Sequence, residues 1–358
     1  MKMKGYINYV FGLIFYFFAS ISSQGQTEKS VASSSSPNLR IMFYNTENFY
    51  DTFDDPKTND NEFLPSSPRH WTLKRYQTKL NNIYKVIISM GAQPPSIIGL
   101  SEIENRKVLN DLAQNTPLIK FNYQIIHKDS PDPRGIDVGV LYRPDFFKPL
   151  NYSFIRISFS SDSARRTRDI IYIKGIALGH DTIHVFVNHW PSRMGGQARS
   201  EILRDETAKI LRNKIDSLFF LSKNNKIIII GDFNDDPDDE SIQNDLKAIK
   251  VTDKIVKGQL YDLSERWLKD IFTVGTIKYK GKWSIFDQII VSSGLLVNNS
   301  KGLKCFPSSA GIYFPNFLLT EDKNYSGKTP FRTYNGYKYI GGFSDHLPIF
   351  IDLFYKSK

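Results

Sequence analysis

Short apolar runs and two longer amphipathic segments dominate the pattern of the chain. Residues 39–44 alternate apolar and polar side chains and predict a first strand. Residues 226–231, which contain four consecutive isoleucines, predict a strand that is buried on both faces. The other predicted strands are 96–100, 138–142, 170–177, 184–188, 285–291 and 347–353. Residues 73–90 and 199–219 repeat apolar side chains every three to four positions, which predicts two helices.

Strands scattered between single helices from residue 39 to residue 353 predict one α/β domain, with no internal repeat and no linker inside it. Residues 51–69 are acidic and interrupted by prolines, so we expect a loop there. Residues 301–342 are rich in Tyr, Phe and Gly and carry no motif that we can place. Two interpretations of that segment remain open, a substrate-facing loop and a structured insertion.

The first 37 residues differ in composition from the rest of the chain. Lys2 and Lys4 precede an apolar run over residues 6–19, and small residues follow at 20–23, a pattern typical of a signal peptide over residues 1–23. A retained membrane anchor is the alternative, but the apolar run is shorter than the ~20 residues that span a bilayer. Residues 24–37 are Ser-rich and predict a flexible linker. We therefore expect a secreted or periplasmic protein with no stable membrane anchor after cleavage.

Composition narrows the function classes. The formal net charge of +10 predicts a basic surface that attracts polyanions such as nucleic acid or anionic lipid, although such a surface can also be merely solvated. Cys305 is the single cysteine, which excludes an intrachain disulfide and a zinc site built on cysteines. With 41% hydrophobic residues, a chain of 358 residues has enough apolar side chains for a large core.

Ionisable and amide side chains recur at the ends of the predicted buried strands. These residues are Asn45, Glu102, His189, Asp232 and Asn234, together with Asp345 and His346 just before the last strand. A strand end holds a polar group rigidly and opens to solvent, so these side chains can converge on one cleft. An oxygen-rich set of this kind suits a hard cation such as Mg²⁺ or Ca²⁺.

Each motif also has a purely structural interpretation. Residues 231–234 (Gly-Asp-Phe-Asn) could be a tight turn, and residues 344–346 (Ser-Asp-His) could be a turn that enters a strand. Glu102 could form an ion pair with Arg106. The cleft would be absent only if every one of these motifs had a purely structural role.

In this order the motifs resemble those of the endonuclease/exonuclease/phosphatase superfamily, which includes deoxyribonuclease I. Asn45 in Tyr-Asn-Thr-Glu-Asn, Glu102 in Leu-Ser-Glu-Ile and His189 in Asn-His-Trp resemble the motifs of the first half. The second half resembles the family at Gly-Asp-Phe-Asn, at Asp287 in Phe-Asp-Gln-Ile and at the terminal Ser-Asp-His. The acidic loop and Trp71 resemble secreted bacterial members, whereas Gln288 stands where many members carry arginine or histidine.

The resemblance implies a fold and a set of roles. The expected fold is a four-layer α/β sandwich, two packed mixed β-sheets flanked by helices, formed by a catalytic domain over residues 38–358. The implied metal ligands are Asn45, Glu102, Asp232 and Asp345, for Mg²⁺ or alternatively Mn²⁺ or Ca²⁺. The implied phosphate-binding residues are Asn45, Arg168 and Asn234. The implied catalytic residues are His189, Asp232, Asn234, Asp287 and His346, with Asp287 orienting His346.

The resulting hypothesis is a secreted, monomeric, metal-dependent phosphodiesterase, an extracellular nuclease that acts on DNA. Arg165, Arg166, Arg168, Arg193 and Arg199 are candidates for contacts with nucleic acid. One alternative is a phosphodiesterase or phosphatase of phospholipids or sugar phosphates; a lipid substrate would require an exposed apolar hairpin, for which residues 313–314 and 317–319 are candidates. Another is a binding module without catalysis, which the complete set of acid–base and metal positions argues against.

Overall fold

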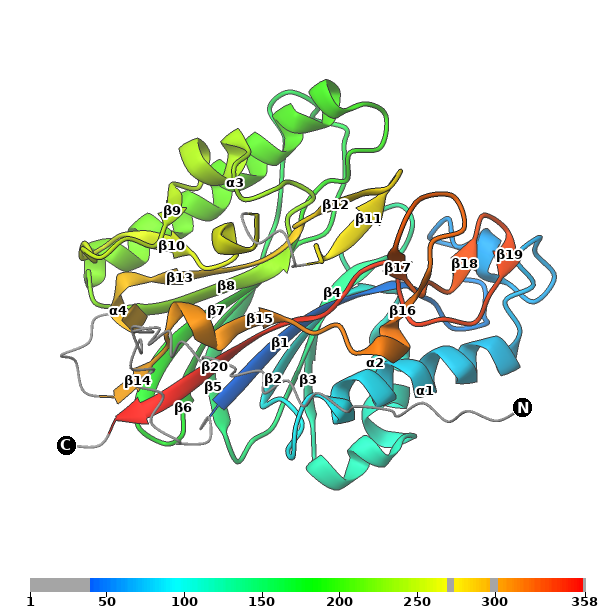
Figure 1. The fold of residues 1–358 in the computed structure, drawn as a ribbon, viewed down its shortest axis with the longest axis horizontal. Helices are drawn as coiled ribbons and strands as arrows, with labels where there is room; N and C mark the ends of the chain where they lie inside the picture. Colours follow the sequence, from blue (N-terminus) through cyan, green and yellow to red (C-terminus); the bar gives the residue numbers. More distant parts are fainter. Residues whose placement is uncertain (1–38, 269–273, 297–301, 357–358) are drawn as a thin grey trace, which may run out of the picture. The chain divides into compact units, whose positions relative to one another are not determined.

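Two large mixed β-sheets lie face to face, and helices cover their outer sides (Figure 1). The computed structural model describes residues 39–268, 274–296 and 302–356. The predicted signal peptide and linker lie outside the described residues, as does residue 301. The first sheet has the order β14-β20-β1-β2-β4-β3, with β15 also paired to β20, and the second has the order β5-β6-β7-β8-β13-β10-β9.

The strands of the first sheet are β1 (Leu39–Phe49), β2 (Ile97–Ile103), β3 (Gln124–His127), β4 (Asp137–Tyr142), β14 (Gly302–Lys304), β15 (Ala310–Ile312) and β20 (Ile349–Lys356). Those of the second sheet are β5 (Phe147–Ile155), β6 (Ile170–Ala177), β7 (Asp181–His189), β8 (Lys226–Asp232), β9 (Ala248–Lys250), β10 (Leu260–Asp262) and β13 (Asp287–Ser292). β1 runs parallel to β2, and β7 runs parallel to β8. Two neighbouring strands in each sheet therefore end at the same edge.

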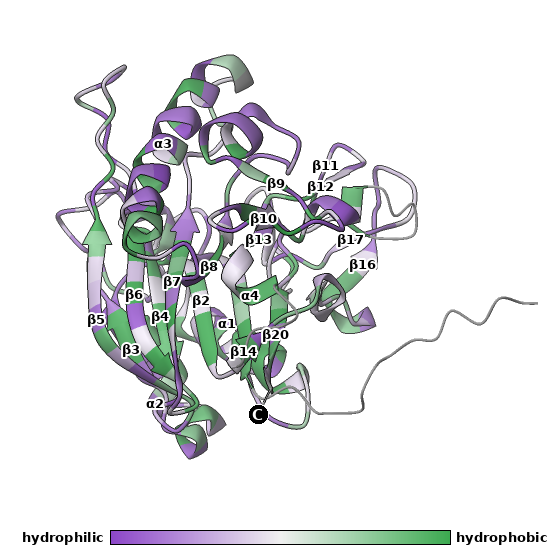
Figure 2. Ribbon diagram, turned by 90° about the vertical axis from the view of Figure 1, so that its left-hand side faces the viewer, coloured by the Kyte–Doolittle hydropathy of each residue, from purple (hydrophilic) through white to green (hydrophobic). Residues whose placement is uncertain are grey.

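The isoleucine run of β8 shows how the layers pack. Ile228 and Ile230 belong to the core between the sheets, whereas Ile227 and Ile229 pack with the helix α3 (Gln197–Leu221) on the opposite side. Strand side chains alternate between the two faces, so a strand between two apolar layers must be apolar at every position. The hydropathy colouring of Figure 2 shows the apolar strands in the interior of the molecule. The helices α1 (Leu73–Ser89) and α2 (Arg106–Gln114) cover the first sheet and complete the predicted four-layer sandwich.

The predicted helices over residues 73–90 and 199–219 correspond to α1 and α3. The prediction missed α2, because its four buried side chains fall within less than two turns. It also missed β5, an edge strand whose residues are mostly exposed or half-buried, so that no alternation marks it. A helix or strand is predicted from the regular spacing of apolar residues that burial of one face produces. Neither α2 nor β5 has enough buried residues to show such a spacing.

Residues 302–342 form a structured part of the chain. β14 and β15 extend the first sheet, while the pairs β16 (Leu319–Glu321) with β17 (Lys328–Pro330) and β18 (Tyr334–Asn335) with β19 (Lys338–Tyr339) make two small hairpins. Figure 1 shows both hairpins beside the end of β1. No helix within the described residues is long and apolar enough to cross a membrane.

Asp262 in β10 is a candidate for stabilisation by substitution. Its carboxylate is buried, and Oδ2 has no hydrogen-bond partner among the described residues. Burial raises the pKa of Asp262 to about 7. Because an aspartate in an unfolded chain titrates near 3.9, the folded state binds more protons between about pH 4 and 7, and stability falls as the pH rises through that window.

We therefore expect Asp262→Asn to raise the free energy of unfolding at pH 8 by about 2 kcal/mol or more, since the amide buries no charge. At pH 4 the two proteins should differ little. Urea denaturation at both pH values measures the effect. A variant that is no more stable than the wild type at pH 8 would show that the carboxylate is compensated in the folded protein.

Candidate active site

The predicted site residues come from both sheets and meet at the edge where β1, β2, β7 and β8 end. The structure corrects two positions. Asn45 and Glu102 lie inside β1 and β2 rather than after them, because both strands continue past a break in register. Glu47, Asn48 and Glu102 have positive φ angles of 50°, 56° and 57° at this break. Such backbone angles cost non-glycine residues free energy and are frequent at functional sites.

Asp232 lies at the centre of the cluster. Its Oδ2 accepts a hydrogen bond from Asn45 Nδ2 at 3.0 Å, and its Oδ1 accepts one from the Asn234 backbone N–H at 2.9 Å. Nε2 of His189 lies 3.6 Å and Nε2 of His346 lies 3.8 Å from Asp232 Oδ2. Burial raises the pKa of Asp232 to about 6, against the lowering effect of His346. Two imidazoles and one carboxylate oxygen thus meet at a single point.

Gly231 allows this strand end to form. A Cβ atom at Gly231 would lie 2.4 Å from the carbonyl oxygen of Asn188 on β7. Any side chain at this position would push β8 away from β7, and with it Asp232 away from His189. The glycine of the Gly-Asp-Phe-Asn motif is therefore required by close packing between the strands.

Asp287 and His346 form a buried pair. Asp287 Oδ2 lies 2.7 Å from His346 Nδ1, and the two side chains are 0% and 6% exposed. Burial alone would lower the pKa of His346, but the charges of Asp287 and Asp232 outweigh it and raise the pKa well above its usual value. The pairing leaves Nε2 of His346 directed at Asp232, so that the imidazolium can face a phosphate in the site.

His189 has the opposite electrostatic environment. Burial, together with the nearby charges of Arg168 and Arg134, lowers the pKa of His189 well below its usual value. The pKa values of the two imidazoles beside Asp232 are therefore shifted in opposite directions. When the pKa values of two neighbouring groups are shifted in opposite directions, one group is suited to act as an acid and the other as a base.

Comparison with known proteins places this arrangement in a family. The sequence profile of the Endonuclease/Exonuclease/phosphatase family matches residues 40–355, which is most of the chain. The chain belongs to the endonuclease/exonuclease/phosphatase family. Members hydrolyse phosphoric ester bonds and depend on a divalent cation, so the protein is a metal-dependent hydrolase of such esters. No curated protein sequence matches the chain.

Solved structures share the fold of this family member. A humanized D. rerio TDP2 with 14 mutations superposes with a TM-score of 0.53 at 13% identity, covering 88% of this chain and 98% of that one. The human Nocturnin catalytic domain gives 0.52 at 15% identity, covering 89% and 94%. The mannosyl-6-phosphatase Bt3783 of Bacteroides thetaiotaomicron gives 0.51 at 18% identity, covering 88% and 100%. At these identities the likeness concerns the fold alone.

The donor set at this edge fits a divalent cation. Ligand atoms of Asp232, Asp287 and His346 lie within 4.8 Å of one another, and since Asp287 and His346 contact each other at 2.7 Å, Asp232 is the member of this group left for a cation. Asp287 Oδ1 is buried without a hydrogen-bond partner among the described residues. Glu102 receives hydrogen bonds from the Asn48 backbone N–H at 2.9 Å and from Asn45 Nδ2 at 3.4 Å. A half-exposed carboxylate beside a buried oxygen-rich cluster is the environment that a hard cation prefers.

The remaining predicted residues lie at the periphery of this cluster. Asp345 is half-buried and pairs with Arg332 at 2.9 Å. Arg168 is buried, pairs with Asp132 at 3.1 Å and donates to the Trp190 carbonyl. Its guanidinium therefore lies inside the protein, where it influences His189, and the direct phosphate contact predicted for it stays a prediction. Gln288 is fully buried as well, and its side-chain amide donates a hydrogen bond to the Asp235 carbonyl at 2.6 Å.

Glu47 and Lys79 are buried charged residues near this cluster that were not predicted from the sequence. Buried Glu47 accepts hydrogen bonds from the Thr333 N–H at 2.6 Å and from Arg332 Nε at 3.2 Å, and burial raises its pKa to about 7. Lys79 of α1, also buried, donates to Thr333 Oγ1 and to the Phe343 carbonyl, both at 2.6 Å. An acidic side chain two residues after Asn45 was the only local signal for Glu47. The partners of Glu47 come from residues about 285 positions later in the chain.

Proposed function

We propose that the protein hydrolyses phosphodiester bonds of nucleic acid, with DNA as the substrate and Mg²⁺ as the cation. The observation that carries the proposal is the convergence of His189 and His346 on one oxygen of Asp232, at 3.6 and 3.8 Å. A bound cation would offset phosphate charge and polarise the phosphorus–oxygen bond. Glu102, Asp232 and Asp345, with Asn45 beside them, would hold that cation, while Mn²⁺ and Ca²⁺ remain alternatives.

The chain's own residues then have distinct tasks. His346, fixed by Asp287, donates a hydrogen bond to a non-bridging oxygen of the phosphate and stabilises the charge that develops there. Asp232 lies where it can accept a proton from the attacking water, and the Asn234 backbone N–H orients its second oxygen at 2.9 Å. His189 Nε2 lies 3.6 Å from Asp232 Oδ2, so it can take up the proton that Asp232 accepts from the water and pass it to the leaving oxygen as the bond between that oxygen and phosphorus breaks.

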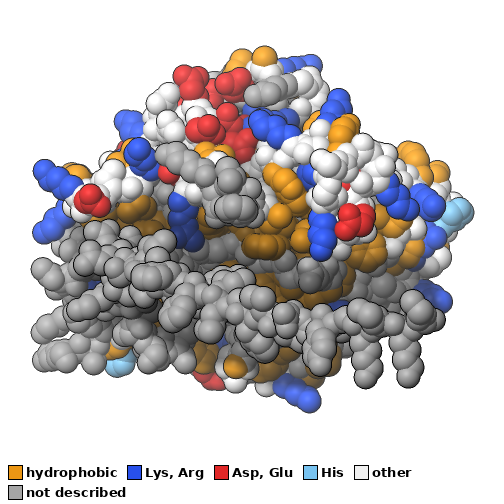
Figure 3. Space-filling model, in the orientation of Figure 1, with side chains coloured by type: hydrophobic (Ala, Val, Ile, Leu, Met, Phe, Trp, Pro, Cys, Tyr) orange, Lys and Arg blue, Asp and Glu red, His pale blue; other side chains and the backbone are white. Residues whose placement is uncertain are grey.

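The preference for nucleic acid rests on charge around the site. Arg332 and Arg134 reach the site with side chains that are 46% and 38% exposed. Of the arginines proposed from sequence, Arg165, Arg166 and Arg199 are exposed. Arg193, in contrast, pairs with Asp235 and Asp239. On the face in Figure 3, Lys and Arg side chains are interspersed with acidic ones, which favours a few local phosphate contacts over one broad basic patch.

The lipid alternative has less support. Of the candidate apolar hairpin, Phe314 is 44% exposed, while Leu318 is buried and the Tyr313 hydroxyl is bonded to the Ser89 carbonyl. These side chains therefore do not form a continuous apolar surface that could enter a membrane. The non-catalytic alternative conflicts with the family assignment and with the complete set of acid–base groups.

We further propose that the protein is exported after cleavage of residues 1–23 and acts as a monomer. N-terminal sequencing of the exported protein tests the cleavage, and its mass in solution tests the oligomeric state.

Purified protein incubated with plasmid DNA, RNA, a phospholipid, a sugar phosphate and a simple phosphodiester, with and without EDTA, tests the proposal. We expect EDTA-sensitive cleavage of DNA. If two substrate phosphates are neutralised in the complex, binding should weaken by roughly tenfold between 50 and 200 mM salt, because counterions are released. Hydrolysis of the sugar phosphate or the phospholipid without cleavage of nucleic acid would contradict the DNA proposal while leaving the chemistry intact.

A further inference from the structure

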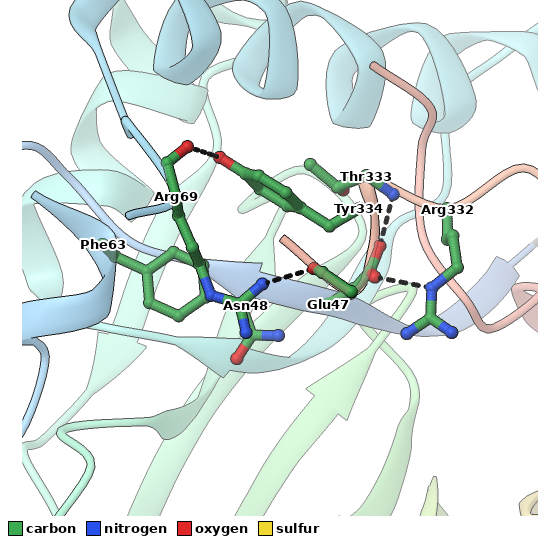
Figure 4. Close-up of a pocket in the computed structure, with 8 residues that line it drawn as sticks. Glu47, Asn48, Phe63, Arg69, Arg332, Thr333 and Tyr334 are labelled. Atoms are coloured by element: carbon green, nitrogen blue, oxygen red, sulfur yellow. Dashed lines mark hydrogen bonds and ion pairs between the residues drawn. The ribbon is translucent and has the colours of Figure 1, made fainter. Parts of the chain in front are cut away.

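A small polar pocket borders the carboxylate cluster, between the end of β1 and the hairpin β18–β19. Its volume is ≈ 150 Å³. The residues that line it are Glu47, Asn48, Phe63, Arg69, Arg332, Thr333, Tyr334 and Gly336. In Figure 4, Arg69 with Phe63 and Arg332 with Glu47 lie on opposite sides of this pocket. Neither the family assignment nor the proposed catalysis gives the pocket a role.

The pocket is joined to the active site at two points. The Asn48 backbone N–H donates to Glu102 Oε2 at 2.9 Å, and Arg332 pairs with Asp345 Oδ2 at 2.9 Å. Both acceptors are carboxylates assigned above to the cation. A group seated in the pocket therefore lies beside the phosphodiester that is cleaved.

Arg69 is held rigidly at one side of the pocket. Its Nε pairs with Glu62 at 2.9 Å, and one terminal nitrogen donates to the Gly336 carbonyl at 3.0 Å. Its guanidinium carbon also lies 5.0 Å from the ring centroids of Phe63 and Tyr337. The other terminal nitrogen makes no hydrogen bond to any of the described residues. The rigidly held guanidinium group therefore keeps N–H donors available for a ligand. Preorganised donors of this kind lose little entropy when they bind an anion.

Arg332 supplies the second guanidinium group of the pocket. Its Nε and one terminal nitrogen are bonded to Glu47 and Asp345, which leaves the other terminal nitrogen for a ligand. Both oxygens of Glu47, the acidic residue of the lining, are already occupied by Thr333 and Arg332. The lining carries two arginines and one glutamate. Each arginine also forms an ion pair with an acidic side chain outside the lining, Arg69 with Glu62 and Arg332 with Asp345, and presents its remaining N–H groups to the pocket. Phe63 and Tyr334 are 8% and 5% exposed, so neither offers a face on which a base could stack.

We propose that Arg69 and Arg332 form a subsite for a second phosphate group of the substrate, next to the phosphodiester being cleaved. Guanidinium groups match phosphate oxygens in geometry and charge, and two of them line this pocket of ≈ 150 Å³. The inference rests on the proposed function, because it defines the substrate as a phosphodiester with a neighbouring phosphate. The second phosphate can be an internal backbone phosphate or a terminal one.

Kinetics on three short DNA substrates test the subsite. The substrates are a dithymidine with one internal phosphate, the same molecule with an added terminal 5′ phosphate, and a trithymidine with two internal phosphates. We expect the second phosphate to raise kcat/KM about tenfold or more in the wild type, and Arg69→Gln or Arg332→Gln to remove most of that advantage, since each variant loses a charged hydrogen bond. Improvement by the 5′ phosphate alone assigns a terminal phosphate, and improvement by the trithymidine alone assigns a backbone phosphate.

Arg212→Gln is the matched control. Arg212 pairs with Asp216 at 2.6 Å and donates to the Leu246 carbonyl at 3.2 Å, contacts of the same kind as those of Arg69, but on α3. It should leave the advantage of the second phosphate unchanged. Equal losses on all three substrates in the Arg69 and Arg332 variants would overturn the proposal and indicate a structural role.

If none of the substrates is hydrolysed, the proposed function fails and the subsite is tested by binding alone. Calorimetry with the 5′-phosphorylated dithymidine and with the unphosphorylated one, both in EDTA, measures the contribution of the second phosphate. Tighter binding of the phosphorylated molecule to the wild type, lost in Arg69→Gln and kept in Arg212→Gln, supports the subsite. Equal binding of both molecules overturns it.

Discussion

Glu102→Gln lowers the turnover of a phosphodiester with Mg²⁺ by about a thousandfold or more, while the melting temperature stays within a few degrees, because loss of one charged ligand removes the electrostatic stabilisation that the cation supplies. Glutamine retains the shape of the side chain and can still accept the hydrogen bond from the Asn48 N–H. Steady-state kinetics over a range of Mg²⁺ concentrations, with thermal unfolding in parallel, measure both quantities.

Glu104→Gln is the matched control for this substitution. Glu104 lies two residues further along the chain and, unlike Glu102, is buried, and burial raises its pKa to about 8. At pH 7 its carboxyl group is mostly protonated and resembles the amide, so turnover should remain within a few-fold of the wild type. Unchanged turnover in Glu102→Gln would exclude Glu102 as a ligand of the cation.

The second large effect concerns the pair of Asp287 and His346. His346→Ala should lower turnover by about a hundredfold or more, the usual contribution of a positioned acid or base. Asp287→Asn should also cost substantial activity, because the imidazole loses the carboxylate that lies 2.7 Å from Nδ1 and favours its charged form. Since both substitutions disable one unit, the double variant should be little slower than His346→Ala alone.

A double-mutant cycle of turnover numbers measures this coupling. His184→Ala serves as a control, because His184 is buried against Tyr172 in the second sheet and burial lowers its pKa to about 4. It should retain turnover near the wild-type level. Losses that multiply fully in the double variant would mean that Asp287 and His346 act independently.

The sequence by itself determined the main strands, two of the helices and which polar residues stand at the strand ends, whereas the layered arrangement followed from the resemblance to the family. Segments that are buried on one or both faces, such as residues 226–231, have apolar residues at the buried positions. This spacing of apolar residues identified the main strands and the helices α1 and α3. Most site residues stand at or near the ends of those runs, so their positions could be predicted without knowledge of strand order. Their spacing also resembled the family to which the chain belongs.

Only the tertiary structure decided how the site is supported and bordered. Arg332 and Lys79 lie in segments whose local pattern resembles any charged surface, yet they contact Glu47 and the Phe343 carbonyl across separations of 285 and 264 residues. Likewise, Arg168 carries the same charge as an exposed arginine, and only its neighbours bury it against Asp132. Hydrophobic periodicity records which face of a segment is buried, but it contains no information about which distant charges a polar side chain will meet.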